Sequence, residues 1–582
     1  MAIYRADQAQ LTFGAEAAIG GYPEGGVGGN QITGTAAIDS STGASAGDRS
    51  LSIDSISGFS TAQTFVGKVI RIGTVATNYE VRRVVFVDGT GTGDSTLHLD
   101  APLAFYHQDN TAIVCIDSVD STSTTGDTEK FIDIIPGVYE TVDLPDPQMS
   151  IEPHYFLGTA SKRDFYSVYS GQQSFTGSLG NFVLLDGKAL RFPIGKVTTI
   201  PLQVDGSTHA IESTSIAIDQ NGNAGTATAP PAKGDIHITV TASHGITDND
   251  YIVIYGAASA SSSAALAKAE VRKVLDVVNT NTLKLDYPLT FDHAHGNWVR
   301  EISSQLSYYS HSISETVDLD TVTWHAHMRA SDEDATKDFD RRYFGGKIGS
   351  ASIAAEEGGM VSMSWNSVNF IGMVHNQARN SAFGSTDLPF YTLMKTIDTD
   401  DVNFSTAEPY YFSHGEVSMF GQTIARIRSF TINISNGEEP RYYIKRQHGR
   451  HRGPTEIREG RREYSMSATL ALPDAGVAAT STTRTLFSEL LLEGDYGSGK
   501  AGFDVSVTFT RGTNDSITIT IPDNGENLDG SNVVAGTGGN KQGAFIRTAP
   551  HNIAGDNVLE VEADILFRNL KIDVSDSQHY YP

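Results

Sequence analysis

Apolar and polar residues alternate along much of this chain with a period of two. The pattern is clearest in "IHITV" at 236–240, "FTINIS" at 430–435, "FDVSVTF" at 503–509 and "SITITIP" at 516–522. Successive side chains of a β-strand point to opposite faces, so this alternation predicts strands with one buried and one polar face. The abundant Gly, Ser and Thr between such segments suit turns. We therefore predict a mainly β protein.

Helical periodicity is rare in the chain. The best candidates are "SAALAKAEVRKVL" at 263–275 and "TRTLFSELLLEG" at 483–494. In the second segment Leu486 and Leu490 share one helical face, and Gly494 is a suitable stop. We expect one or two short helices beside the strands.

A strand pattern near the N-terminus returns about two hundred residues later. Residues 80–84, "EVRRV", are followed by "LHLDAPLAF", and residues 270–274, "EVRKV", are followed by "LKLDYPLTF". Each copy ends near an aromatic and histidine segment, and low-complexity stretches such as "STGASAGDRS" and "AASASSSAA" border the copies. Such borders are typical of a module inserted into a surface loop. We predict two related small β modules, immunoglobulin-like or barrel-like, at residues 36–117 and 201–302.

A fainter duplication covers the remaining sequence. Pro153 begins "PHYFL" and Pro440 begins "PRYYI"; after a loop, Gly171 begins "GQQSFTGSL" and Gly460 begins "GRREYSMSA". An alternating strand follows in both copies. This predicts two larger modules, the first made of residues 1–35, 118–200 and 303–380 and the second of residues 381–582.

The charge balance restricts the partners of the protein. The chain has 42 basic and 69 acidic residues, hence a net charge of −27. Such a field repels phosphates and anionic lipid surfaces, which argues against general DNA binding. We see no secretory signal and no apolar run of the length that a membrane-spanning helix needs, so we expect no membrane insertion. The single cysteine, Cys115, allows no intramolecular disulfide or cysteine zinc site, and we interpret it as a small buried residue.

The sequence evidence for catalytic or metal-binding residues is weak. Ser45 lies in "GASAG", the spacing of a nucleophile elbow, but in a low-complexity connector that lacks the flanking strand and helix. His293 and His295, and likewise His325 and His327, are spaced to share a metal on one strand face, yet no further ligands are evident. We therefore favour packing or surface hydrogen bonding for both pairs.

Three acidic clusters could offer oxygen ligands to a divalent cation. They are "SDEDATKD" at 331–338, "DTDDVN" at 398–403 and "DNGENLDGS" at 523–531, and none fits the calcium-loop template. We interpret them as solvated turns. No phosphate-binding loop, paired-carboxylate signature or Cys/His couple stands out, so we expect no cofactor and no metal, and we predict a structural protein and not an enzyme.

Several longer segments together resemble a known family. "LTFGAEAAIGGYPEG", "IPGVYETVDLPDPQ", "SFTGSLGNFVLLDGKALRFPIGKV", "DFDRRYFGGKIGSASIAAEEGGMVSMSWNSV" and "GPTEIREGRREYSMSATL" resemble the tail tube, or major tail, proteins of long-tailed viruses of bacteria and archaea. The resemblance covers nearly everything outside the two inserted modules. It implies that each larger module is a β-sandwich with a flanking helix.

The resemblance also implies an assembly. Six tube modules per ring join their inner sheets into a closed barrel, so a duplicated chain needs three copies, and stacked rings form the tube. We expect DNA to pass through the lumen to the host without specific binding, helped by an acidic lining. The expected location is the virion tail, after synthesis in the host cytoplasm. The expected partners are further copies of the chain and the tape-measure and tail-terminator proteins.

Two other functions stay open from the residues alone. Repeated β modules with Ser/Thr-rich connectors suit a cell-surface or virion adhesin that binds glycans. Scattered carboxylates leave room for a hydrolase of polysaccharides, which would need two carboxyl groups at a defined separation.

The only strongly basic run is "EPRYYIKRQHGRHRGPTEIREGRREYS", which begins at Glu439. Its counterpart from Glu152 lacks most of the basic residues, so we interpret both as a strand, a long loop and a returning strand. In an acidic oligomer the nearest abundant anion is a neighbouring subunit, and we therefore predict a docking arm between subunits or rings. Its basic residues are Arg441, Lys445, Arg446, Arg450, Arg452, Arg458, Arg461 and Arg462.

Overall fold

The fold was analysed in a computed structural model of the 582-residue chain. The structure describes residues 4–16, 35–57, 69–73, 80–88, 94–99, 102–103, 105–115, 136–139, 141–154, 167–202, 216–217, 221–222, 226–227, 230–231, 237–240, 244–248, 250–256, 268–279, 282–285, 289–294, 296–302, 308–316, 318–330, 339–375, 407–419, 422–424, 427–442, 453–454, 456–471, 504–512, 514–521, 543–548, 551–552 and 560–577.

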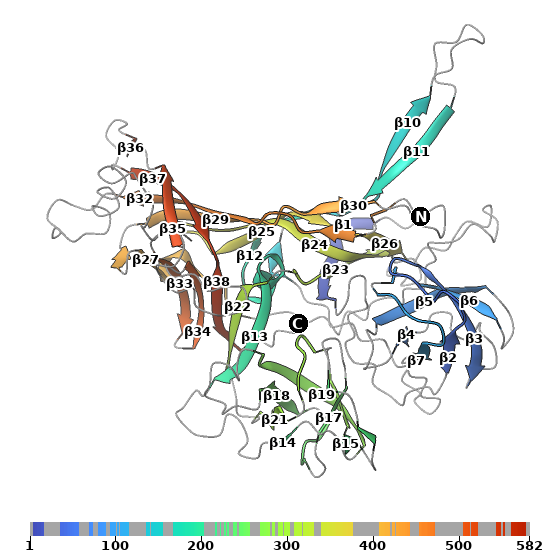
Figure 1. The fold of residues 1–582 in the computed structure, drawn as a ribbon. Coiled ribbons are helices and arrows are strands. Elements are labelled where there is room, and N and C mark those ends of the chain that lie inside the picture. Colours follow the sequence, from blue (N-terminus) through green and yellow to red (C-terminus); the bar gives the residue numbers. More distant parts are fainter. Residues whose placement is uncertain are drawn as a thin grey trace, which may run out of the picture.

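A 13-stranded sheet, the long sheet, is the largest element of the fold (Figure 1). Eight of its strands form one continuous antiparallel path, in the order β35-β37-β32-β29-β24-β25-β12-β8, and β1, β9, β23, β26 and β36 pair beside this path. The path strands are β35 (Gly543–Thr548), β37 (Glu560–Arg568), β32 (Glu463–Ala471), β29 (Ile427–Ser435), β24 (Phe339–Glu356), β25 (Ser362–Asn369), β12 (Thr176–Val183) and β8 (Val138–Tyr139). The others are β1 (Tyr4–Ala15), β9 (Val142–Asp143), β23 (Val322–Ala330), β26 (Gly372–His375) and β36 (His551–Asn552).

A seven-stranded sheet packs against one face of the long sheet and completes a β-sandwich. Its order is β13-β22-β38-β34-β33-β27-β28. The strands are β13 (Gly195–Leu202), β22 (Tyr308–Glu315), β38 (Lys571–Asp576), β34 (Asp515–Ile521), β33 (Val505–Gly512), β27 (Gly415–Met419) and β28 (Gln422–Ile424).

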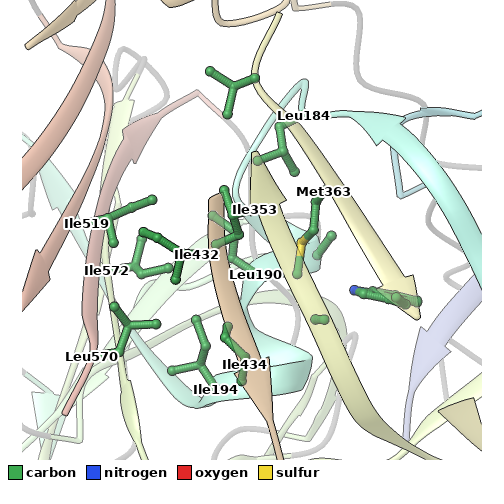
Figure 2. Packing of buried hydrophobic residues seen from close by; sticks show 14 of the residues in the cluster. Leu184, Leu190, Ile194, Ile353, Met363, Ile432, Ile434, Ile519, Leu570 and Ile572 are labelled. Carbon is green, nitrogen blue, oxygen red and sulfur yellow. The ribbon is translucent and has the colours of Figure 1, made fainter. Parts of the chain in front are cut away.

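One continuous hydrophobic core fills the sandwich, and its residues come from both sheets and from both halves of the chain. Figure 2 shows Ile353 and Ile432 of the long sheet close to Ile519 and Ile572 of the second sheet. On β29 from Phe430 onward, and along β37, every second residue is buried, as the period-two alternation predicts. The hydrophobic residues of each strand therefore face the core, and the polar residues face outward.

Aromatic rings reinforce the core beneath β25. The ring of Trp365 packs edge-on against Phe13 at 5.2 Å and Phe182 at 5.7 Å, and stacks on Trp324 at 6.2 Å between ring centroids. These residues come from β25, β1, β12 and β23. Rings of this size bury large apolar areas, so the cluster ties N-terminal and central strands into one layer.

Two small β units lie on the same side of the long sheet as the second sheet (Figure 1). The first is a closed barrel in the order β2-β3-β6-β5-β4-β7, and the second is a six-stranded sheet in the order β14-β21-β18-β19-β20-β17. The barrel strands are β2 (Thr35–Ile38), β3 (Ser50–Ser57), β4 (Val69–Ile72), β5 (Glu80–Asp88), β6 (Ser95–Leu99) and β7 (Ala112–Cys115). The sheet strands are β14 (Ile216–Ala217), β17 (His237–Thr239), β18 (Tyr251–Tyr255), β19 (Glu270–Asn279), β20 (Thr282–Leu285) and β21 (Trp298–Glu301).

Three two-stranded ribbons complete the described strands. They are β10 (Gln148–His154) with β11 (Ser167–Ser174), β15 (Asn221–Gly222) with β16 (Thr226–Ala227), and β30 (Glu439–Arg441) with β31 (Glu456–Arg458). The β10–β11 ribbon contains Glu152, the β30–β31 ribbon begins at Glu439, and both ribbons are antiparallel. The predicted strand and returning strand are therefore confirmed in both copies, and most of the residues between them lie outside the described part of the chain.

The mainly β prediction is confirmed, but one predicted helix is wrong. Residues 270–275 belong to strand β19, not to a helix over 263–275. Val271 and Val274 pack into separate apolar clusters on opposite faces of this strand. A strand that is buried on both faces loses the period-two alternation, which explains the error. The predicted helix at 483–494 lies outside the described residues.

The helices that the structure describes are short. They are the α-helix α1 (Arg191–Ile194) and the 3-10 helices η2 (Lys188–Leu190) and η5 (Phe412–His414). In the described part of the chain, none of them has the length and hydropathy that crossing a membrane would require.

Candidate assembly surfaces

The outward face of the long sheet is lined by short, uncharged polar side chains. Along β12, β24, β25, β29 and β32, the partly or fully exposed positions are occupied mainly by Ser, Thr and Asn. We call this set the hydroxyl face. Its residues are Thr176, Ser178, Ser350, Ser352, Ser364, Asn366, Ser367, Ser429, Thr431, Asn433, Ser435, Ser465, Ser467 and Thr469.

The strand register places these side chains side by side across four or more strands. Ser352 pairs with Asn433 across β24 and β29, and Thr431 pairs with Ser467 across β29 and β32. The hydroxyl of Ser429 donates a hydrogen bond of 3.2 Å to the hydroxyl of Thr469. Cross-strand neighbours of an antiparallel sheet share a face, so the residues form one continuous surface.

Charged residues lie along one flank of this face and at the ends of its strands, where Glu356 pairs across from Ser429 and Glu463 from Ser435. On β37 the outward positions include Glu560, Glu562 and Asp564, and the register places Asp564 opposite Ser467. Arginines neutralise two of these carboxylates, because Arg428 lies 3.0 Å from Glu560 and Arg547 donates to Asp564 at 2.7 Å. The acidic part of the face is thus a partly paired border beside β32.

The two ends of the eight-strand path are short strands. At one end β35 pairs with β37, and at the other β8 and β9 both pair with β12. Val138 on β8 is 53% exposed, although an isolated apolar side chain at a sheet edge gains from burial. Exposed sheet edges are templates for pairing with another chain.

The β10–β11 ribbon stands away from the body of the protein (Figure 1). Every residue of β10 is exposed, and the ribbon presents the apolar side chains of Met149, Ile151 and Val168 to solvent. Ile151 is 63% exposed. A projecting ribbon with apolar side chains is a suitable surface for contact with another protein.

Four of the predicted basic residues are described, in the β30–β31 ribbon and directly after it, and they have carboxylates close by. Arg441 lies 2.6 Å from Glu439, and Arg461 lies 3.3 Å from Glu463. Arg458 pairs with Glu456 in the same ribbon. Their charge is therefore partly offset locally. Four of the predicted residues lie outside the described residues: Lys445, Arg446, Arg450 and Arg452.

Arg462 has a structural role at the root of this ribbon. Its Nε donates to the side-chain oxygen of buried Asn436 at 2.8 Å, and its Nη1 donates to the carbonyl of Thr316 at 3.2 Å. Nη1 also lies 3.2 Å from Glu315. Asn436 in turn donates to the carbonyl of Ile348 at 2.8 Å. Arg462 thus joins the ribbon to β22 and, through Asn436, to β24.

A carboxyl group with a strongly shifted pKa lies in the same root. Burial raises the pKa of Glu438 to about 8; Lys347 opposes this shift, and the neighbouring carboxylate of Glu459 adds to it. Glu459 accepts a hydrogen bond of 2.8 Å from the Lys347 ammonium group. Two carboxyls close to one lysine favour protonation of the less well paired one.

Comparison with known families agrees with this architecture. The sequence matches the family described as phage tail tube protein over residues 6–565, nearly the whole chain. The chain belongs to the phage tail tube protein family. The predicted family resemblance is therefore confirmed, and membership places the protein in the virion tail as a structural component. No curated protein matches the sequence.

Both small β units of this tail tube protein contain the same buried polar triad. In the barrel, Glu80 pairs with Arg82 and accepts from His107 Nε2 at 2.8 Å. In the six-stranded sheet, Glu270 pairs with Arg272 and accepts from His293 Nε2 at 2.6 Å. All six side chains are almost fully buried.

The triad in the six-stranded sheet also fixes a loop. The Glu270 carboxylate accepts the backbone N–H of Thr290 at 2.8 Å. Burial alone would raise the pKa of Glu270, but Arg272, His293 and this N–H together hold its pKa below the usual value. The carboxylate is thus the centre of a local network and not a solvent-accessible acid.

Sequence reasoning missed these triads, although it identified the repeats that carry them. The signal was present: both copies read Glu-Val-Arg, and each has a Pro-Leu-x-Phe-x-His segment after the following strand. We interpreted His293 as a packing or surface residue, and the structure gives it a buried carboxylate partner. His295 lies outside the described residues.

The other chemical candidates form no site in the described part of the tail tube protein. Ser45 is exposed in a turn, where its N–H bonds to Asp48, and it follows no strand of the nucleophile-elbow kind. His325 and His327 are buried on β23. Among described residues, no group of three or more His, Cys, Asp or Glu side chains could hold a metal ion. The acidic clusters at 331–338, 398–403 and 523–531 lie outside them.

Proposed function

We propose that three copies of this chain close into a ring, and that stacked rings form the tail tube through which DNA is delivered to the host. The observation that carries the proposal is the continuous eight-strand path of the long sheet. The strands after each ribbon, β32 and β12, are each the third strand of a four-strand half of the path, counted in the same direction along β35-β37-β32-β29 and β24-β25-β12-β8. One chain thus supplies two half-sheets of similar design, so a trimer has quasi-six-fold symmetry.

Ring closure has a clear physical benefit. Three eight-strand paths joined edge to edge would form a barrel of 24 strands, in which β35 of one copy approaches β8 and β9 of the next. Closure pairs the open backbone groups of both edges and covers the exposed side chain of Val138. Rotational symmetry then satisfies all of these edges.

Ring stacking needs contacts along the tube axis, and the two ribbons are the best candidates. The β10–β11 ribbon offers exposed apolar side chains, and the loop of the β30–β31 ribbon contains Arg450 and Arg452. In an assembly of acidic chains this loop meets carboxylates of a neighbouring copy. We therefore expect charge reversal at Arg450 and Arg452 to shorten or abolish tubes. Unchanged tube assembly by that variant would contradict the docking arm.

The remaining partners follow from this role. The tube ends and the tube interior need proteins of their own, and we propose a tail-terminator protein and a tape-measure protein for these places. We further propose synthesis in the host cytoplasm, no membrane insertion, and passage of DNA without specific binding.

Electron microscopy of purified protein and of virions tests the ring. We expect stacked rings with a central channel and three chains per ring. The variant V138K should remain folded but fail to close rings, because it places an ammonium group at the edge contact. The matched control is Y106K on the barrel, since Tyr106 is similarly exposed, at 55%. It should assemble normally.

The alternative of a glycan-binding adhesin predicts a different result. A strictly monomeric wild-type protein, no rings in virions, and saturable glycan binding that is lost on deletion of residues 201–302 would favour the adhesin.

A further inference from the structure

We propose that the hydroxyl face lines the channel and that the central surface offered to passing double-stranded DNA is electrically neutral, with charged groups confined to the strand ends and one flank. This inference rests on the proposed tube function. It goes beyond that function because it assigns the channel residues, and it differs from the acidic lining that the net charge of −27 suggests.

The first argument is the composition of the face. Soluble protein surfaces usually have about 25–35% charged residues, and charged residues make up 19% of this chain, most of them acidic. Yet the central outward positions of five neighbouring strands are mainly Ser, Thr and Asn, and the charged residues Glu356, Arg428 and Glu463 lie at the ends of β24, β29 and β32. It also lacks the large apolar side chains that a stable protein interface usually buries. The face therefore suits neither ordinary solvent exposure nor a permanent protein contact.

The second argument is position. The second sheet, the barrel and the six-stranded sheet all lie on the opposite side of the long sheet (Figure 1). When the path closes edge to edge, one side of the long sheet must become the inside of the barrel. The bulky units fit only outside, so the hydroxyl face is left on the inside.

The third argument is electrostatic. The hydroxyl positions contain no Lys or Arg, and Arg428 at the end of β29 is paired with Glu357 and Glu560. A face without unpaired cations releases few counterions from DNA and so gives little salt-dependent adhesion. A single positive charge about 4 Å from a phosphate gains about 1 kcal/mol even in water. In a tube this gain would recur in every copy of every ring and would trap the moving chain. Hydroxyls on rigid strands instead hold water in a regular pattern, and the energy of DNA changes little as it advances.

The carboxylates of β37 complete this arrangement. Glu562 and Asp564 lie beside Thr469 and Ser467 across the strand pair, at the border of the face. Arg547 pairs with Asp564. The border therefore adds only a weak repulsion, and the neutral strip is the surface that DNA meets most closely.

Cysteine labelling of assembled tubes tests the assignment. In a background with Cys115 replaced by Ala, the single variants N433C and S467C place a thiol on neighbouring strands of the hydroxyl face. The variant Y106C is the control on the barrel. Each is treated with N-ethylmaleimide or with a long-chain polyethylene glycol maleimide, before and after assembly.

We expect all three thiols to react with both reagents in unassembled protein. In tubes, N433C and S467C should keep their reaction with the small reagent and lose that with the long one, whereas Y106C keeps both. Reaction of N433C and S467C with both reagents in tubes would place the face outside. Loss of both reactions would place it in a contact between copies. Either result overturns the inference and leaves the tube intact, whereas absence of wild-type tubes refutes the proposed function itself.

A second experiment tests neutrality. Virions with S467K should assemble normally but deliver DNA more slowly than wild type, and raised salt should restore the rate. The matched variant S467N, which adds size without charge, should deliver DNA at the wild-type rate. Equal rates for S467K and S467N at low salt would refute the neutral lining.

Discussion

The buried triad around Glu270 allows a quantitative test of how the inserted six-stranded sheet is stabilised. The substitution R272M removes the guanidinium group and leaves the carboxylate with His293 and the N–H of Thr290. Removing one partner of a buried ion pair costs about 3–5 kcal/mol, because the remaining charge stays buried. A domain is typically stable by only about 5–15 kcal/mol. We therefore expect R272M either to unfold this unit locally or to lower strongly the midpoint of its unfolding transition.

The double variant E270Q/R272M separates charge from packing. It removes both charges and keeps a side-chain oxygen that can accept the N–H of Thr290. We expect it to recover about 2 kcal/mol or more relative to R272M, because no unpaired charge stays buried. Together with the wild type and the single variants R272M and E270Q, the double variant completes a cycle that gives the coupling energy between Glu270 and Arg272.

Hydrogen exchange measured by mass spectrometry is the assay, since it reports each unit separately. In R272M, exchange should rise in β18, β19 and β20 and stay unchanged in the barrel. The matched variant R82M should show the reverse, because Arg82 holds the same place in the barrel. If R272M costs less than about 1 kcal/mol, or if E270Q/R272M is no more stable than R272M, the charge argument is refuted.

The same network fixes a pH dependence. The pKa of Glu270 is lowered in the folded protein from its ordinary value of 4.5. Its contribution to the free energy of unfolding is therefore fully present above about pH 4.5 and is lost as the pH falls through the lowered pKa. Unfolding followed between pH 3 and pH 7 should show this loss in wild type, and the loss should be smaller in R272M.

Further predictions concern the ribbons. Because burial raises the pKa of Glu438 to about 8, the contribution of Glu438 to the free energy of unfolding should decline as the pH rises from about 4.5 to about 8. Chemical denaturation of E438Q should show a smaller decline over this range, and a pH profile identical to that of the wild type would contradict the assigned burial. R462M should lower the free energy of unfolding by about 2–4 kcal/mol, because several hydrogen bonds to a charged group are lost. The control R461M, at an exposed position, should change the free energy of unfolding by less than about 0.5 kcal/mol. Equal shifts of the melting temperature in the two variants would refute the anchoring role of Arg462. I151S should leave the melting temperature unchanged and shorten tubes seen by electron microscopy, since Ile151 is exposed in the single chain; tubes of normal length would exclude a stacking contact there.

Much of the fold was predictable from short-range sequence features. The alternation on β29 and β34 determined which side chains are buried, because strand geometry alone sends successive residues to opposite faces. The duplicated ribbons were predictable from the spacing of Pro153 and Pro440 from the following glycines. The family was likewise recognisable from strand segments spread along the chain.

Other features depend on contacts between distant residues and were decided by the tertiary structure. Strand β19 looked helical because apolar clusters cover both of its faces, which no local pattern reveals. Arg462 looked like its basic neighbours, yet Asn436 and the carbonyl of Thr316 make it an anchor. The hydroxyl face exists only because the register of β24 and β29 aligns separate Ser, Thr and Asn positions. The sequence determined the faces of single strands, and the pairing of distant strands decided which of those faces became one surface.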